Sequence, residues 1–351
     1  MKKIALVAIF AVAMESAALL PQGNWEPSVR DRLNEVIERN KGNPDAYAVF
    51  DFDYTTAIGD LSYVCMWKIL ERLDLRTDDV HTMFTKDIPQ SHMDEATALA
   101  NIVTELKPMA GQDLTENQKW RMFIKRYWTL YRRLYDDIGE YRAYLWRTRV
   151  FMGYTPDEMK SLAKRAITDE LKHGRLRRDK NAPKEKRGLA FTPELKELFR
   201  ELRNAGISVY IVSGSFQETL LVATGPEFGF DLDPSCVFGA QLKTDANGRF
   251  LPEMKEGCVK SRQKPAFIRK NIAPRHHGAE PILAAGDSMG DYSMLTEFKN
   301  LQLALLFRRD WREQEMHDLA ASGGKIAVQG RDETQGKLIP SHDSIFPNKK
   351  K

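Results

Sequence analysis

Paired carboxylates occur at two places in the sequence. Asp51 and Asp53 directly follow one short apolar run, and Asp287 and Asp291 directly follow another. Four carboxylates that converge on one site repel each other and raise each other's pKa values, unless a metal ion or bound protons compensate. A few hard oxygen ligands suit Mg²⁺, which usually keeps water molecules and an anionic ligand in its coordination shell. The two pairs therefore indicate a site for a divalent cation.

Three further residues could bind an anion next to these carboxylates. Ser213 follows a third apolar run, and the hydroxyl group can donate a hydrogen bond to a phosphoryl oxygen. Gly214 lets its backbone N–H approach an anion closely. Lys264 lies at the start of a predicted helix, where its charge can neutralise both a carboxylate and a bound phosphate. Lys255 and Lys260 are close enough in the sequence to remain alternatives for this role.

Five short apolar runs predict the strands that position these residues. Three of the runs are followed directly by Asp51, Ser213 or Gly286, and helical patterns such as Thr192–Asn204 separate the runs. Strands that alternate with helices indicate a parallel sheet covered on both faces, and the carboxyl ends of such strands share one edge. The predicted strands are Ala46–Phe50, Ile207–Val212, Cys236–Leu242, Ile282–Ala285 and Leu301–Phe307.

The segment between the first two strands is different. It has no strand pattern, and its apolar residues follow helical spacing, so we expect an inserted helical lobe over residues 61–189. Its charged exit, Gly174–Gly188, mixes acids with bases and is expected to be a solvated linker. A further helix is predicted ahead of the first strand, at Val29–Asn40. The helices predicted in the insertion are Leu61–Leu73, Met93–Leu106, Asn117–Trp146 and Pro156–Lys172.

Taken in order, the four motifs resemble those of the haloacid dehalogenase superfamily: Asp-x-Asp-x-Thr, a strand-terminal Ser, a Lys, and Gly-Asp-x-x-x-Asp. This resemblance implies an α/β fold with a Rossmann-like parallel-sheet core over residues 19–60 and 190–351. An all-helical cap would be inserted over residues 61–189. The insertion resembles that of the phosphoserine phosphatase-like branch, and the N-terminal region is more loosely similar to secreted phosphorylcholine phosphatases.

The resemblance also implies a role for each site residue. Asp51 would be the nucleophile that forms an aspartyl-phosphate, and Asp53 the general acid and base. Asp51, the Asp53 main-chain carbonyl, Asp287 and Asp291 would hold or orient Mg²⁺. Ser213, Gly214 and Lys264 would bind the phosphoryl group. The residue after Asp53 is Tyr54, where the family more often has Asn or Gly.

The expected activity is hydrolysis of a small alcohol phosphate of the phosphocholine, phosphoethanolamine or phosphoserine type. Two alternatives remain: a phosphotransferase or mutase that uses the same intermediate, and a non-catalytic protein that binds phosphate esters. Aromatic residues of the insertion could cage a quaternary ammonium group by cation–π attraction, or could form the core of the insertion. These residues are Trp67, Phe84, Trp120, Phe123, Tyr127, Trp128, Tyr131, Tyr135, Tyr141, Tyr144 and Trp146.

Composition narrows the class of protein. The chain has 351 residues, of which 42% are hydrophobic and 29% charged, as in ordinary globular proteins. A net charge of +4 does not indicate a nucleic-acid partner. Cys65, Cys236 and Cys258 match no zinc or disulfide pattern, and their redox state stays open. The oligomeric state also stays open.

The N-terminus has the order of regions expected of an export signal. Met1–Lys3 is basic, Ile4–Met14 is apolar, and small residues follow at Ala17 and Ala18. The apolar run is too short for a membrane span, and no later stretch is apolar enough to form one. We therefore predict a signal peptide over residues 1–18, cleavage near Ala17 or Ala18, and a periplasmic or secreted mature protein.

Overall fold

The structure is a computed structural model that describes residues 20–182, 185–257, 259 and 261–347. The predicted signal peptide, Lys260 and Cys258 are outside this part of the chain, so the predictions about them stay predictions. Cys65 and Cys236 are free thiols, and Cys65 is buried. Among the described residues, every helix is too short or too polar to cross a lipid bilayer.

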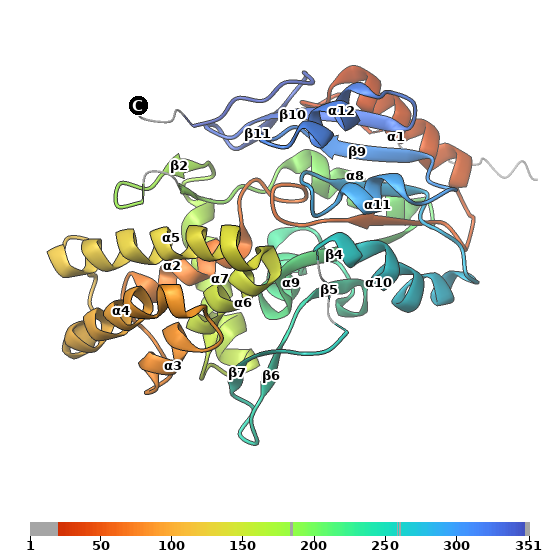
Figure 1. The fold of residues 1–351 in the computed structure, drawn as a ribbon. Helices are drawn as coiled ribbons and strands as arrows, with labels where there is room; N and C mark the ends of the chain where they lie inside the picture. Colours follow the sequence, from red (N-terminus) through yellow and green to blue (C-terminus); the bar gives the residue numbers. More distant parts are fainter. Residues whose placement is uncertain (1–19, 183–184, 258, 260, 348–351) are drawn as a thin grey trace, which may run out of the picture.

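A seven-stranded sheet forms the centre of the molecule, in the order β11-β10-β9-β8-β1-β4-β5 (Figure 1). All neighbouring strands are parallel except β10 and β11. In the middle, Val49 of β1 pairs with Tyr210 of β4 on one side and Ala284 of β8 on the other. The strands are β1 (Tyr47–Phe50), β4 (Ser208–Phe216), β5 (Val237–Ala240), β8 (Leu283–Gly286), β9 (Leu303–Phe307), β10 (Ile326–Asp332) and β11 (Lys337–Ile339).

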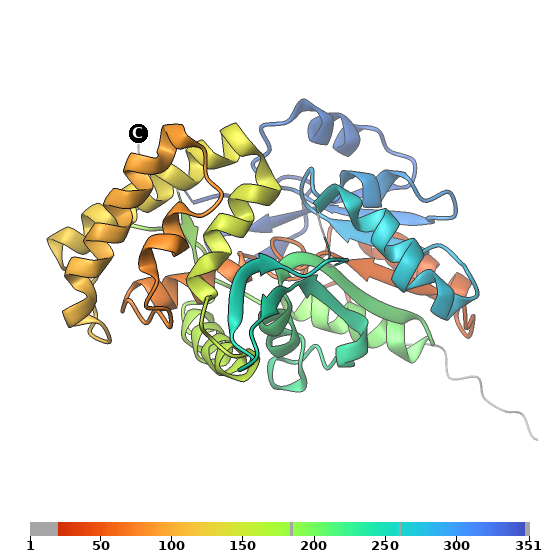
Figure 2. The same ribbon diagram turned by 60° about the horizontal axis from the view of Figure 1, so that its bottom comes forward.

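Helices cover both faces of this sheet. Alternate strand residues enter two separate hydrophobic cores: Ala48 and Phe50 enter one, and Tyr47 and Val49 enter the other. Figure 2 shows the cyan helix α10 above the sheet and the light-green helix α8 below it. The first core contains residues of α1 (Pro27–Asn40), α8 (Pro193–Asn204) and α9 (Gln217–Ala223). The second contains residues of α10 (Lys264–Asn271), α11 (Tyr292–Thr296) and α12 (Gln314–Ala321). The predicted covered parallel sheet is therefore confirmed.

Residues 61–171, between β1 and α8, are mostly helical and lie beside the sheet, on the left of Figure 1. One prediction is wrong here: Asn117–Trp146 forms two helices, because Gly139 between them has a φ of 83° that ends the first. The short helix α3 was not predicted. The helices are α2 (Leu61–Leu70), α3 (Val80–Thr85), α4 (Met93–Leu106), α5 (Gln118–Ile138), α6 (Glu140–Thr148) and α7 (Pro156–Leu171).

The exit of the insertion is not the solvated linker that its charge pattern predicted. Strands β2 (Arg177–Arg178) and β3 (Lys186–Arg187) pair antiparallel. Arg187 forms ion pairs with Glu71 and Glu170, and the Lys186 Nζ lies 2.5 Å from the fully buried Glu333 of the core. These charges are partly buried and paired. The Arg187 pairs lie within the insertion, and the Lys186–Glu333 pair joins the insertion to the core.

The remaining unpredicted elements have little apolar periodicity. In β10, only Ile326–Val328 is apolar, although Gln329 and Arg331 are also buried. Strands β6 (Leu242–Thr244) and β7 (Phe250–Met254) form a hairpin, whose Phe250 exchanges backbone hydrogen bonds with Gly153 and Tyr154 of the insertion. Short 3₁₀ helices occupy Gln90–His92, Lys107–Met109, Arg149–Phe151, Pro226–Phe228, Pro234–Cys236, Ser261–Gln263 and Ala273–His276.

Candidate active site

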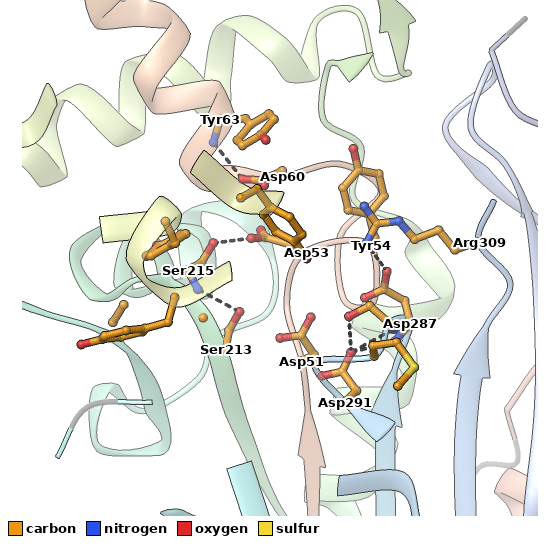
Figure 3. Close-up of a pocket in the computed structure, with 18 of the residues that line it drawn as sticks. Asp51, Asp53, Tyr54, Asp60, Tyr63, Ser213, Ser215, Asp287, Asp291 and Arg309 are labelled. Carbon is orange, nitrogen blue, oxygen red and sulfur yellow. Dashed lines mark hydrogen bonds and ion pairs between the residues drawn. The ribbon is translucent and has the colours of Figure 1, made fainter. Parts of the chain in front are cut away.

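A pocket of about 490 Å³ opens where the carboxyl ends of β1, β4 and β8 meet the insertion (Figure 3). The pairing of these three strands brings together segments that are more than 230 residues apart in the chain, from Asp51 to Asp287. All of the predicted site residues line this one pocket: Asp51, Asp53, Ser213, Gly214, Lys264, Asp287 and Asp291.

Asp51 lies at the floor of the pocket beside Lys264. The Lys264 Nζ donates hydrogen bonds to Asp51 Oδ1 at 2.6 Å and to Asp291 Oδ1 at 2.7 Å, and all three residues are buried. Burial raises the pKa of Asp51 to about 7; Lys264 opposes this shift, whereas Asp291 and Asp287 add to it. Lys264 thus occupies the place predicted for the cation. Lys255 is exposed and bonds to Gln241.

Asp287 and Asp291 have different surroundings. Asp287 Oδ2 accepts a hydrogen bond from Arg309 at 2.8 Å, and Asp287 Oδ1 accepts one from Thr55 at 3.2 Å. Asp291 Oδ2 turns back to the loop, where it accepts from the backbone N–H groups of Asp287 and Ser288. Asp291 therefore braces the loop that carries Asp287.

Gly286 makes this bracing possible. A Cβ atom on Gly286 would lie 2.4 Å from the Asp291 Cβ, which is closer than carbon atoms can approach without a shift of the backbone. Only glycine therefore fits at the end of β8, where the Asp291 side chain packs against it.

Three carboxylates of the pocket are arranged as ligands for a metal ion. One oxygen from each of Asp51, Asp287 and Asp291 lies within 4.8 Å of the others. Opposite ligands of a Mg²⁺ ion are about 4.2 Å apart, because each bond is about 2.1 Å long. Among the described residues, Lys264 and Arg309 form the ion pairs with these three carboxylates, so the paired cations are fewer than the carboxylates. A small divalent cation fits this donor set.

Asp53 lies above Asp51, at the side of the pocket that faces the insertion (Figure 3). Its Oδ1 accepts a hydrogen bond from the backbone N–H of Leu61 at 2.8 Å, and its Oδ2 accepts one from the hydroxyl of Ser215. Burial raises the pKa of Asp53 well above its ordinary value, and the carboxylates of Asp60 and Asp51 add to the shift. A raised pKa allows a carboxyl group to hold a proton that it can donate.

Ser213 and Gly214 line the pocket at the end of β4, which lies on the other side of β1 from the strand that leads to Asp287. The β4–β5 pairing is irregular between Val212 and Phe216, so this stretch bends away from the regular ladder. Ser213 Oγ accepts a hydrogen bond from the N–H of Ser215 at 3.2 Å and can donate its own proton to a bound anion.

The sequence did not predict that Arg309 and Tyr54 contact each other in this pocket. The guanidinium group of Arg309 lies 4.1 Å from the centre of the Tyr54 ring, within the range of a cation–π contact. Tyr54 has a φ of 56°, in the left-handed region. A bulky side chain in this region costs roughly 1–2 kcal/mol, which explains why Asn or Gly is common at this position. The only sequence signal was the departure of Tyr54 from the family pattern.

A cluster around Arg147 forms the part of the pocket that belongs to the insertion. Arg147 is 5% exposed, and its guanidinium carbon lies 4.1 Å from the ring centre of Tyr63, 4.8 Å from Tyr144 and 5.4 Å from Tyr131. Asp60 lies 3.7 Å from Arg147. Arginines are numerous in the insertion, and no local pattern distinguished this one.

Most aromatic residues of the insertion form its hydrophobic core, as in the second of the two interpretations above. Four aromatics from that set line the pocket: Tyr131, Tyr135, Tyr141 and Tyr144. The others with core positions are Trp67, Phe84, Trp120, Phe123, Tyr127, Trp128 and Trp146, all of which are at most 2% exposed.

Comparison with known proteins agrees with this geometry. Residues 109–296, slightly more than half of the chain, match the haloacid dehalogenase-like hydrolase family. The matched segment contains Ser213, Lys264, Asp287 and Asp291, whereas Asp51 and Asp53 precede it. The chain is 26% identical over 264 residues to a phosphorylcholine phosphatase of Pseudomonas aeruginosa, a match that covers 73% of this chain and 66% of that protein.

A solved structure has the same fold. A conserved protein of unknown function from Anaerococcus prevotii superimposes with a TM-score of 0.80 and 23% identity, over 94% of this chain and 99% of that chain. The ordered motifs, their meeting at one edge of a parallel sheet and the family match lead to one conclusion. The chain belongs to the haloacid dehalogenase-like hydrolase family.

Proposed function

We propose that this protein is a Mg²⁺-dependent phosphomonoesterase that hydrolyses a small alcohol phosphate through an aspartyl-phosphate at Asp51. The observation that carries the proposal is the buried group of Asp51, Lys264, Asp287 and Asp291, with Asp53 above Asp51 in the same pocket (Figure 3). The named activity of the Pseudomonas aeruginosa relative supports the same chemistry.

Each covalent step has a residue in position. Lys264 holds Asp51 Oδ1, so the other carboxylate oxygen can attack phosphorus while the bond from phosphorus to the alcohol oxygen breaks. Asp53 donates a proton to the departing alcohol. It then takes a proton from a water molecule that attacks phosphorus, which releases phosphate and restores Asp51.

The remaining residues bind the anion and the metal ion. Ser213, Gly214 and Lys264 would donate hydrogen bonds to the phosphoryl oxygens. The carboxylates of Asp51 and Asp287 and the main-chain carbonyl of Asp53 would hold Mg²⁺, with Asp291 orienting the loop. When bound, Mg²⁺ would neutralise phosphate charge and polarise the phosphoryl group.

The insertion would act as a cap that selects the leaving alcohol. Arg147 already occupies the faces of three tyrosines, so these rings are not open to a quaternary ammonium group. Asp60 and Arg147 together offer one negative and one positive group. This pair favours an alcohol with both an ammonium and a carboxylate group, as in phosphoserine, over phosphocholine.

Release of phosphate from p-nitrophenyl phosphate by the full chain tests the reaction. We expect turnover that requires Mg²⁺ and that Asp51→Asn abolishes. Asp31→Asn, the same change at an exposed residue of α1, should leave turnover intact. Full activity of Asp51→Asn would refute the mechanism. Rates with phosphoserine, phosphoethanolamine and phosphocholine would then rank the alcohols.

Export is a separate part of the proposal. Residues 1–18 would direct secretion and be removed, so N-terminal sequencing of the protein from the periplasm or culture medium should start near residue 18 or 19. A mature protein that retains Met1 would contradict export.

A further inference from the structure

We propose that Ser215 and Ser62 are positioning residues that hold the carboxyl group of Asp53 in the orientation needed to protonate the leaving alcohol. This inference rests on the proposed function and adds two residues to it. Neither serine belongs to the four motifs, since Ser213 is the motif serine and Ser62 lies in the first turn of the insertion.

The two serines form a buried hydroxyl chain that ends on Asp53. Ser62 and Ser215 are 1% and 2% exposed, and their Oγ atoms lie 3.0 Å apart. Ser215 Oγ is also hydrogen-bonded to Asp53 Oδ2 (Figure 3). A serine hydroxyl has one proton to donate, so the order of donors along this chain matters.

The backbone sets that order. The N–H of Phe216 lies 3.3 Å from Ser62 Oγ, and an amide N–H can only donate. Ser62 accepts this bond and can direct its own proton to Ser215. Ser215 then keeps its own proton for Asp53 Oδ2, and this carboxyl oxygen can accept it whether Asp53 is ionised or protonated. With this order of donors, each hydroxyl proton in the chain points toward Asp53.

A second donor holds the other carboxyl oxygen. The N–H of Leu61, at the start of α2, lies 2.8 Å from Asp53 Oδ1. The carboxyl plane is thus fixed by one donor from the insertion and one from the end of β4. Rotation of the Asp53 side chain would break both bonds.

The hydrogen-bonded chain positions Asp53. In the proposed cycle, the proton that Asp53 gives to the alcohol returns from the water that hydrolyses the aspartyl-phosphate, so the two serines need not conduct protons.

The test compares two leaving groups in the variant Ser215→Ala. The p-nitrophenolate ion leaves without a proton, whereas an alkyl alcohol such as that of phosphoethanolamine needs one. The ratio kcat/KM reports only the steps up to release of the alcohol, so it isolates the protonation by Asp53. General acid catalysis contributes about 10²–10⁴-fold, and loss of its orientation should cost a large part of this with the alkyl ester.

We expect Ser215→Ala to lower kcat/KM at least tenfold more for the alkyl ester than for p-nitrophenyl phosphate. Ser62→Ala should show the same selectivity to a smaller degree, and Ser215→Thr, which keeps a hydroxyl, should recover part of the loss. Ser208→Ala, at the opposite end of the same strand, is the matched control. The aryl substrate reports the fraction of folded sites in each sample.

An equal loss with both substrates, or no loss with either, would overturn the positioning role while leaving the proposed function in place. Absence of turnover by the wild-type protein with both esters would instead refute the proposed function and, with it, this inference.

Discussion

Replacing Arg147 with alanine should turn the tyrosine cluster of the insertion into a site for a quaternary ammonium group. In the protein, the guanidinium group faces the rings of Tyr63, Tyr131 and Tyr144 at 4.1 to 5.4 Å. Its removal leaves three aromatic faces around an open space, with Asp60 still at the border.

The size of the effect follows from the number of ring faces. A cation that contacts an aromatic face at a partly exposed site gains about 0.5–1 kcal/mol, so three faces would provide roughly 1.5–3 kcal/mol. Because about 1.4 kcal/mol corresponds to a factor of ten, the preference for phosphocholine over an uncharged ester of the same shape should rise roughly 10- to 150-fold.

The assay is the ratio of kcat/KM for phosphocholine to kcat/KM for its uncharged analogue 3,3-dimethylbutyl phosphate, which has the same shape but no cation to gain from the rings. Partial unfolding lowers both values equally, so the ratio is insensitive to it. Arg147→Lys keeps a cation in the cluster and serves as the matched control, with a ratio close to that of the wild type. An unchanged ratio in folded Arg147→Ala would refute the reasoning, because the ring faces would then not contact the substrate.

Three other perturbations test the site and the ion pairs within the insertion. Lys264→Met removes the buried cation, so the metal-free protein should lose about 3–5 kcal/mol in urea unfolding. Calorimetry should show that Mg²⁺ binds this variant more tightly, because the positive charge beside Asp51 and Asp291 is gone. Weaker binding would contradict the excess of carboxylates over cations at this site. Gly286→Ala forces a Cβ against Asp291, which should cost about 1–3 kcal/mol and weaken Mg²⁺ binding; an unchanged affinity would show that the loop adapts. Burial raises the pKa of Glu170, but its arginine partners, including Arg187, more than offset this and leave the pKa below the ordinary 4.5. Glu170 therefore stabilises the fold above pH 4.5, and this contribution disappears as the pH falls through the lowered pKa. Glu170→Gln should cost about 1.5–3 kcal/mol at pH 7 and progressively less at acid pH, whereas a constant difference across the pH range would contradict the assignment.

Several parts of the fold could be predicted because their signals are local. The strands β1, β4, β8 and β9 are short apolar runs that end in a polar residue, and burial on both faces of a parallel sheet requires such runs. The predicted helix Met93–Leu106 has the observed bounds. By contrast, the polar half of β10 is buried through partners from distant segments, as when Arg331 bonds to the Tyr54 carbonyl. Such burial leaves no periodic pattern in the sequence.

The same division applies to the candidate site. Asp51, Asp53, Ser213, Lys264, Asp287 and Asp291 each follow a strand or begin a helix. Position along the chain was therefore enough to place the five strand-end residues at one edge of the sheet. For the lysine, the sequence left Lys255 and Lys260 as alternatives, and the structure places Lys264 against Asp51 and Asp291.

Three features depended on the tertiary structure. They are the choice of Arg147 among the arginines of the insertion, the contact of Tyr54 with Arg309, and the order of donors through Ser62 and Ser215. These contacts join segments up to 255 residues apart, from Tyr54 to Arg309, and each depends on side-chain direction after packing. Sequence by itself determined which groups could do the chemistry, because strand ends are encoded by neighbouring residues. The tertiary structure decided which groups surround and orient them, because hydrogen bonds and ring contacts between distant segments form only when the insertion packs against the sheet.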